Sequence, residues 1–269
     1  MMGLATAAVH SMVDIFKNFD TYSLKARVFP ALIAGLPTLA LLFIIVPWDH
    51  LSLSQTISAS MGLVLIFAFA DMARNRGKYI QAKLGTGETP EQWHRGNADI
   101  PEGSKDRFRI FVANQLKQNT PSADEEKADP NRANDFYRSA GAWLRDRTRD
   151  TRAFPILFGE NITYGFRRNL LGLKSTALVC NILVLAFCTG IIYIRPRYFM
   201  SLTQIEEKLI IVIAAVLLHS AYMVFAVSKY AVRDASRAYG RQLILSCDTL
   251  MKPPRAVSPK KEVKSNASR

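Results

Sequence analysis

The sequence lacks the residue patterns that mark the common kinds of catalytic site. It holds no G-x-x-x-x-G-K-[ST] phosphate loop, because Gly77-Lys78 is followed by tyrosine in a predicted helix. Its four histidines stand far apart and never in the H-E-x-x-H spacing that places two zinc ligands on one helical face. No G-x-S-x-G elbow occurs either. We therefore expect a protein that is not an enzyme and that holds neither a cofactor nor a metal ion.

Cysteine is scarce, and the pattern of β-strands is almost absent. The three cysteines are Cys180, Cys188 and Cys247, and no two of them form a C-x-x-C pair. Neither a disulfide framework nor a zinc site is therefore indicated. Alternation of apolar and polar residues is rare, whereas apolar residues recur at three and four positions in many places. This predicts an all-α fold.

Long apolar runs are what the sequence has instead. Crossing about 30 Å of hydrocarbon takes roughly 20 helical residues. Four blocks are long enough, and they separate a membrane part from a water-facing part. The second is the weakest, because Asp71 closes it early and serines dilute its outer end. The sequence predicts four transmembrane helices, at Val28–Pro47, Leu51–Ala73, Ser175–Ile194 and Leu209–Ser228.

The distribution of lysine and arginine predicts the orientation of these spans. The segment before the first span holds three of them, residues 71–174 hold nineteen and the segment after the fourth holds ten, which is 32 of the 35. The remaining three lie between the third and fourth spans. Cytoplasmic segments next to spans are enriched in these residues. We expect a multi-pass protein with both termini and the long loop in the cytoplasm.

Helical periodicity divides the chain further. Ser104 is a candidate cap for a helix to about Gln118, a second helix fits Arg132–Asp150, and 121–130 is either turn-rich or one short helix. The helix of span two should continue over Arg74–Leu84 and end at Gly85–Pro90.

The predicted divisions are an amphipathic arm (1–27) that lies in the interface or on the cytoplasmic part, a first helical pair (28–73), a helical cytoplasmic module between spans two and three (74–174), a second pair (175–228), a basic helix (229–251) and a disordered tail (252–269).

Polar residues inside the predicted spans are candidates for a functional path. His219 lies near the middle of the fourth span, where ionisable groups are costly and face other helices or water. It either hydrogen-bonds to a neighbouring span or lines a polar path, with Asn181 and Ser220 as partners. Asp71 could pair with Arg74 at the cytoplasmic end.

A basic stripe follows the fourth span. Lys229, Arg233, Arg237 and Arg241 recur at every fourth residue and so share one face of a helix, with Val232, Tyr239, Leu243 and Ile244 left for packing. The stripe is either a solvated face near anionic lipid or a surface for a phosphorylated ligand. The net charge of +13 does not indicate nucleic-acid binding, because membrane topology already explains cytoplasmic cations.

The densest unusual sequence precedes the third span and is here called the collar (154–174). Aromatic residues, glycines and three cations gather there, as expected at a membrane interface. We expect Glu160 to pair with Arg167 or Arg168 and so to give the collar a fixed shape. Its candidate structural residues are Glu160, Asn161, Tyr164, Arg167 and Arg168.

The collar reads E-N-x-x-Y-G-F-R-R-N-L-x-G-L-K from Glu160 to Lys174. This pattern, together with several shorter motifs between residues 77 and 150, resembles a widespread family of uncharacterised bacterial membrane proteins with four spans. The resemblance covers most of 74–174 and implies a bacterial inner-membrane protein with a shared cytoplasmic module. It implies no established activity, so no catalytic residue is carried over. The other residues of the resemblance are Gly77-Lys78, Pro90, His94-Arg95, Trp143-Leu144-Arg145 and Thr148-Arg149-Asp150.

Two functions fit these features. One is a channel-like or membrane-permeability effector controlled through the cytoplasmic module, which must be a homo-oligomer because four helices are too few for a wide pore. The other is a membrane scaffold that docks a cytoplasmic protein or anionic lipid. The scaffold needs no polar path through the bilayer.

Overall fold

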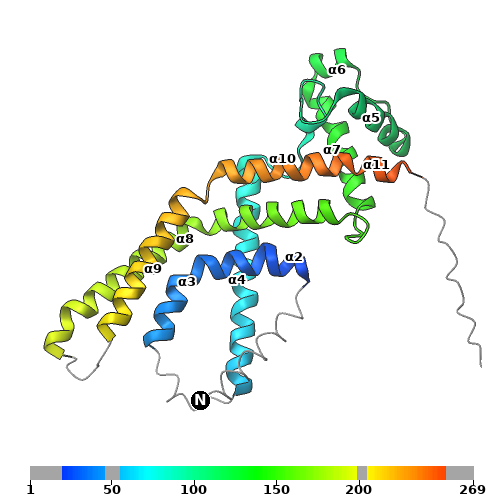
Figure 1. Cartoon of the computed structure of the whole chain (residues 1–269). Helices are drawn as coiled ribbons and strands as arrows, with labels where there is room; N and C mark the ends of the chain where they lie inside the picture. The colour runs from blue at the N-terminus through cyan, green and yellow to red at the C-terminus, as the bar shows by residue number, and fades with distance from the viewer. Residues whose placement is uncertain (1–19, 46–54, 199–204, 253–269) are drawn as a thin grey trace, which may run out of the picture.

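The computed structural model describes residues 20–45, 55–198 and 205–252, and every regular element within them is a helix, as the sequence predicts (Figure 1). The predicted arm, up to residue 19, and the predicted tail, from residue 253, lie outside the described residues. The elements are α2 (Thr21–Ser23), the π-helix η1 (Leu24–Val28), α3 (Phe29–Ile45), α4 (Gln55–Leu84), the 3₁₀-helix η3 (Pro90–Gln92), α5 (Glu102–Leu116), α6 (Ala123–Ala128), α7 (Pro130–Arg147), α8 (Pro155–Tyr198), α9 (Ile205–Phe225), α10 (Lys229–Leu245) and α11 (Cys247–Leu250).

Three stretches of the described chain are long and apolar enough to cross a membrane. They are Thr21–Ile45, Pro155–Ile194 and Ile205–Phe225. The predicted second span, Leu51–Ala73, begins outside the described residues, and its described part is the beginning of α4, which is not among the three. The continuation of that helix to Leu84 is confirmed, and it ends at Gly85, whose φ of +62° is readily adopted by glycine.

One long helix, α8, connects the two halves of the molecule. It packs against η1, α3, α4, α9 and α10. In Figure 1 its far end runs beside α9, away from α5, α6 and α7, which gather at the opposite side. The predicted boundary between module and third span, at 174, lies inside this unbroken helix.

The core is divided along α8 into three apolar clusters. Leu157 and Tyr164 belong to a cluster with α5, α7, α10 and α11. Leu173 belongs to a second cluster with α3, α4 and the end of α9, and Val184 to a third with the outer parts of α3 and α9. Because one helix contributes to all three clusters, α8 links the membrane-type helices to the compact helical part. We call the compact part, η3 and α5 to α7 with α10 and α11, the module. It differs from the predicted cytoplasmic module (74–174), because α10 and α11, which follow the last span, pack into it.

Local capping explains where the module's helices begin. Ser122 and Glu125 form a reciprocal capping box at the start of α6, and of the two alternatives left open for 121–130 the structure has the short helix. The Asp129 carboxylate accepts from the first amides of α7, and Pro130 occupies its first position. The predicted cap at Ser104 is wrong. The helix starts two residues earlier, at Glu102, after the extended backbone of Pro101.

Candidate functional site

The collar forms the first half of α8 and lies where α8 meets η1, α4, α9 and α10. Its side chains reach a different neighbour on each side. We call this meeting point the joint, and it is made by Gly77, Tyr164, Arg167, Arg168, Asn169, Gly172 and Lys174.

Asn169 is at the centre of the joint and is fully buried. Its amide nitrogen donates to the backbone oxygen of Ala26 in η1 at 2.5 Å, and its oxygen accepts from Arg168 Nε at 3.3 Å. A side-chain carbon at Gly77 on α4 would lie 1.8 Å from the Asn169 oxygen. Asn169 therefore fits only because α4 has a glycine there, and its amide ties the π-helix to α8.

Gly172 makes the second close contact between α8 and α4. A Cβ atom at Gly172 would lie 2.7 Å from the backbone carbonyl carbon of Arg76 and 2.8 Å from the backbone nitrogen of Gly77. Both distances are well below van der Waals contact, so a Cβ atom there would repel the α4 backbone. The closely packed interior leaves that backbone no space into which it could move. Together the two glycines let α4 and α8 cross with their backbones nearly in contact.

Tyr164 and Arg168 connect the joint to the loop after α4. The Tyr164 hydroxyl is 3.0 Å from Thr86 Oγ1, and its ring stacks on Tyr239 of α10 with centroids 6.2 Å apart. Arg168 donates to Gln81 Oε1 at 2.5 Å. The loop's own backbone is held by α10, since the Gly87 amide donates to Ser236 Oγ at 2.9 Å. The end of α4 is thus fixed to both α8 and α10.

Arg167 and Lys174 hold the helices that follow. Arg167 donates to the Asp234 carboxylate and to the backbone oxygen of Ala231, each at 3.1 Å. Lys174 Nζ donates to two backbone oxygens at the end of α9, at 3.1 and 2.8 Å. Lys174 thus lies near the C-terminus of α9, where a cation satisfies carbonyls that have no intrahelical partner, whereas Arg167 bonds to the first turns of α10.

The expected pairing of Glu160 with Arg167 or Arg168 is wrong. Both arginines are engaged by acceptors on α10 and α4, which lie beside α8, whereas Glu160 is on its first turns. Glu160 and Asn161 have no side-chain hydrogen bond in the described structure. The expected Asp71–Arg74 pair is also replaced, because Asp71 accepts from Asn75 Nδ2 at 2.8 Å. Tyr164, Arg167 and Arg168 do belong to the joint.

The structure brings His219, Asn181 and Ser220 together between α3, α8 and α9. His219 Nε2 is 2.8 Å from the Ile33 backbone oxygen, which can only accept, so this nitrogen carries a proton. The Asn181 amide lies 2.9 Å from His219 Nδ1 and 2.8 Å from Ser220 Oγ. Both ring nitrogens of the buried histidine are therefore bonded to neighbouring helices. The sequence left two hypotheses for His219, a hydrogen bond to a neighbouring span or a place in a polar path. This geometry matches the first, and a polar path through an assembly stays a prediction.

The basic stripe lies along the exposed side of α10. All four cations are exposed, and the residues that the sequence left for packing are buried on the other side. Arg241 Nε donates to the Asp99 backbone oxygen at 3.0 Å. Lys229, Arg233 and Arg237 make no ion pair within the described residues. The stripe is therefore open to an anionic partner from outside the chain.

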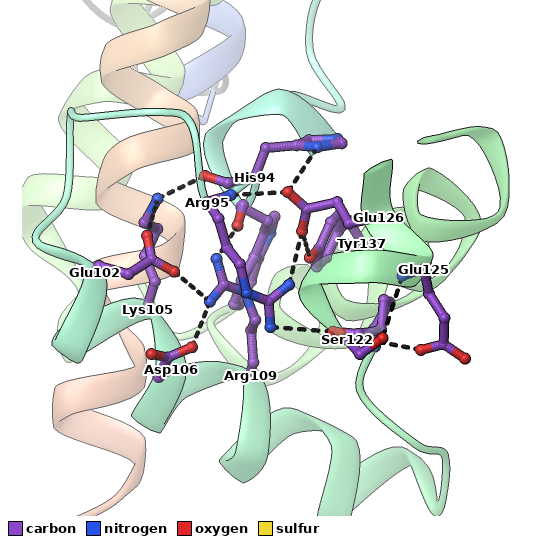
Figure 2. Close-up of polar contacts among 12 residues, drawn as sticks. His94, Arg95, Glu102, Lys105, Asp106, Arg109, Ser122, Glu125, Glu126 and Tyr137 are labelled. Atoms are coloured by element: carbon purple, nitrogen blue, oxygen red, sulfur yellow. Dashed lines mark hydrogen bonds and ion pairs between the residues drawn. The ribbon is translucent and has the colours of Figure 1, made fainter. Parts of the chain in front are cut away.

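A buried polar network inside the module was not predicted from the sequence (Figure 2). The Glu126 carboxylate, 8% exposed as a residue, accepts from Tyr137 Oη at 2.6 Å and from the backbone and side chain of Arg95 at 2.9 and 3.0 Å. His94 Nδ1 lies 3.3 Å from the same carboxylate. The available sequence signals were His94-Arg95 and the capping pattern at Ser122. Neither indicates that Glu126 is the carboxylate that contacts His94 and Arg95.

Two further cations of this network are completely buried. Lys105 Nζ donates to the backbone oxygens of His94 and Asn97, at 2.5 and 2.7 Å, and pairs with Glu102. Arg109 bonds to Glu102, Asp106 and the Trp93 backbone oxygen. Because buried charges are stable only when paired, this network reads as the structural link between the loop 92–99 and α5 to α7.

We expect Glu126→Gln to make the module's stability less dependent on pH. Burial alone would raise the pKa of Glu126, but the bonds from Tyr137 and Arg95 outweigh it and hold the pKa below its ordinary value. The charged form thus stabilises the fold above the unfolded pKa, and this is lost as pH falls through the folded pKa. At pH 7 the variant should lose about 2 kcal/mol, and the difference should shrink towards pH 3.

Thermal unfolding of the detergent-purified protein between pH 3 and 8 measures this effect. Glu91→Gln is the matched control, because Glu91 is exposed and makes no ion pair in the part of the chain described. A constant difference between Glu126→Gln and the parent at every pH would contradict the prediction.

The fold and the joint define a class: an all-helical protein with three described helices able to cross a membrane, joined through one of them to a compact helical module. Within the described residues no group of three His, Cys, Asp or Glu side chains could hold a metal ion. No family model, no curated protein and no solved structure matches this chain. The resemblance of the collar to a bacterial membrane family stays a prediction.

Proposed function

We propose that the chain is a four-span protein of the bacterial inner membrane, with its termini and module in the cytoplasm, and that it acts as a homo-oligomer that changes membrane permeability under the control of its module. Span two is Leu51–Ala73, whose described part is the beginning of α4. The cytoplasmic placement is supported by the 32 cations that lie on that side of the predicted spans.

The observation that carries this proposal is the continuity of α8. The helix begins in the core of the module at Leu157 and reaches the outermost core cluster at Val184 and Cys188. No linker separates the two parts, and the joint fixes α4, η1 and α10 to the same helix. A displacement of the module therefore moves the spans. A passive anchor has no need of such a rigid connection, whereas a controlled membrane effector depends on it.

The scaffold is the second candidate, and the basic stripe is the observation that favours it. Lys229, Arg233 and Arg237 present unpaired charge on the outer side of α10. A phosphorylated ligand, an acidic cytoplasmic protein or anionic lipid would all match this charge. In the scaffold the partner binds there and no solute crosses the membrane.

Potassium efflux from vesicles tests the proposal. The purified protein is reconstituted, and efflux is compared for the parent, for Arg168→Ala and for Arg149→Ala. Arg168→Ala loosens the joint by removing the bond to Gln81, whereas Arg149 is exposed and its ion pair in the described part of the chain is with Asp146, one turn away. If the joint keeps the spans in their resting arrangement, we expect clearly faster efflux from Arg168→Ala vesicles than from the other two. No potassium efflux from any of the three would overturn the permeability function and leave the scaffold.

A further inference from the structure

Helix α4 touches its own chain along a narrow strip. Between residues 64 and 79 its buried positions are Ala70, Ala73 and Gly77, at intervals of three and four residues. All three are small, and Ala73 and Gly77 pack on α8, where Gly172 permits the close crossing. Met72, beside Ala73, is half-buried and also contacts this cluster. The other sides of α4 are open, and Val64, Leu65, Phe69 and Tyr79 are each about half exposed or more.

The open side of α4 carries a groove of about 480 Å³. Its residues have a heptad pattern, because Ala68, Met72, Asn75 and Tyr79 follow one another by four, three and four positions. Leu65 extends the series by one step. In paired helices such positions form the contact seam. The groove is lined by Ala68, Asp71, Met72, Asn75, Arg76 and Tyr79.

Two opposite charges flank this seam. Asp71 lies on one side and Arg76 on the other, five residues further along, at the positions that form salt bridges between parallel paired helices. Asp71 accepts a hydrogen bond from Asn75 one turn away, and neither Asp71 nor Arg76 makes an ion pair among the described residues. Two parallel copies of α4 would place Asp71 of each beside Arg76 of the other. The face is thus complementary in charge to itself.

We propose that α4 pairs in parallel with α4 of a second copy of this chain, along Leu65 to Tyr79. The inference rests on the proposed function, because membrane insertion gives both copies the same orientation. The seam ends near Tyr79, since the next flanking pair would bring Lys78 of one copy against Lys83 of the other. A symmetric pairing of this kind makes the dimer the unit from which a larger assembly is built.

Disulfide formation in native membranes tests the contact. Ala68→Cys places a thiol in the seam, and copper phenanthroline should join the two copies. Leu218→Cys on α9 is the matched control, because Leu218 is 74% exposed at an apolar position that the inference leaves facing lipid. The parent protein, with Cys180, Cys188 and Cys247, gives the background. Absence of the Ala68→Cys dimer would overturn the inference.

A charge exchange tests the register. Asp71→Arg or Arg76→Asp alone should lower the cross-linked fraction of Ala68→Cys about tenfold, because two attractive pairs become repulsive. The double exchange Asp71→Arg with Arg76→Asp should restore it, which also shows that the single variants still fold. Unchanged cross-linking in the single variants would overturn the inference. Native mass spectrometry distinguishes the two proposals. An oligomer that does not form the Ala68→Cys cross-link would contradict the α4 pairing but not the proposed function, whereas a monomer would contradict both.

Discussion

Replacing Gly172 by alanine is expected to be among the most damaging single changes in this protein. The added methyl carbon would lie 2.7 Å from the backbone of Arg76, and backbone cannot move aside as a flexible side chain can. Either α4 and α8 separate or the chain is strained. Overpacking of this kind costs about 3 kcal/mol, which corresponds to a fall in Tm of about 10 °C for a chain of this size.

Thermal unfolding with a matched glycine in the same helix measures this cost. Gly159 is also in α8, but a Cβ atom there would meet nothing within 4 Å. Gly159→Ala should therefore leave Tm unchanged or raise it slightly, because alanine favours helix by about 1 kcal/mol over glycine. Equal effects of the two variants would show that α4 and α8 do not cross as closely as the structure indicates.

The features that depend on helical periodicity and on charge counts could be predicted from the sequence. The all-α fold, the end of α4 at Gly85, the helices near 104–118 and 132–150 and the exposed stripe on α10 all follow from patterns within one segment. The helix bounds shifted by a few residues because caps such as Asp129 and the extended Pro101 decide them locally. Span number and orientation are predictions that the described structure supports only as far as three apolar helices.

The joint could be predicted only as an unusual segment. Gly77, Asn169 and Gly172 are recognisable as part of the collar pattern and its resemblance, but which helix each meets depends on a crossing between segments about 90 residues apart. Without it, Arg167 and Arg168 had only Glu160 as a nearby acid, and the predicted pair was wrong. The Glu126 network was missed for the same reason, since His94 and Tyr137 converge on it from separate elements.

The joint also explains why a π-helix persists near the start of the first described span. A π-helix is rare and is retained mainly where function or packing requires it. Here the Ala26 carbonyl, in the middle of η1, receives the Asn169 amide, and Gly165 leaves room for Ala26 and Tyr22. The π-helix is therefore fixed to α8 by a buried amide, and α3, which follows it directly, packs against α8 and α9 as well.

Asn169→Asp is expected to destabilise the protein in a pH-dependent way. The aspartate has nearly the same shape, but its charged carboxylate cannot donate to the Ala26 oxygen and instead repels it. Burial and this repulsion raise the pKa of the new carboxyl in the folded state above its unfolded value of about 3.9. The unfolded state then loses its proton first, so stability falls as pH rises from 4 towards the folded pKa. At pH 8 the loss should be about 3 kcal/mol or more.

Hydrogen exchange and thermal unfolding at pH 5 and pH 8 separate this effect from general damage. Faster exchange should appear first at 24–28, because η1 loses the hydrogen bond that Asn169 donates to it from α8, while the module's α5 to α7 keep their protection. Asn114→Asp, at an exposed position of α5, is the control and should change neither measurement. Uniformly faster exchange across the module would mean that Asn169 supports the whole fold. The proposed role of its amide, which is to hold η1 and the start of the first span against α8, would then be wrong.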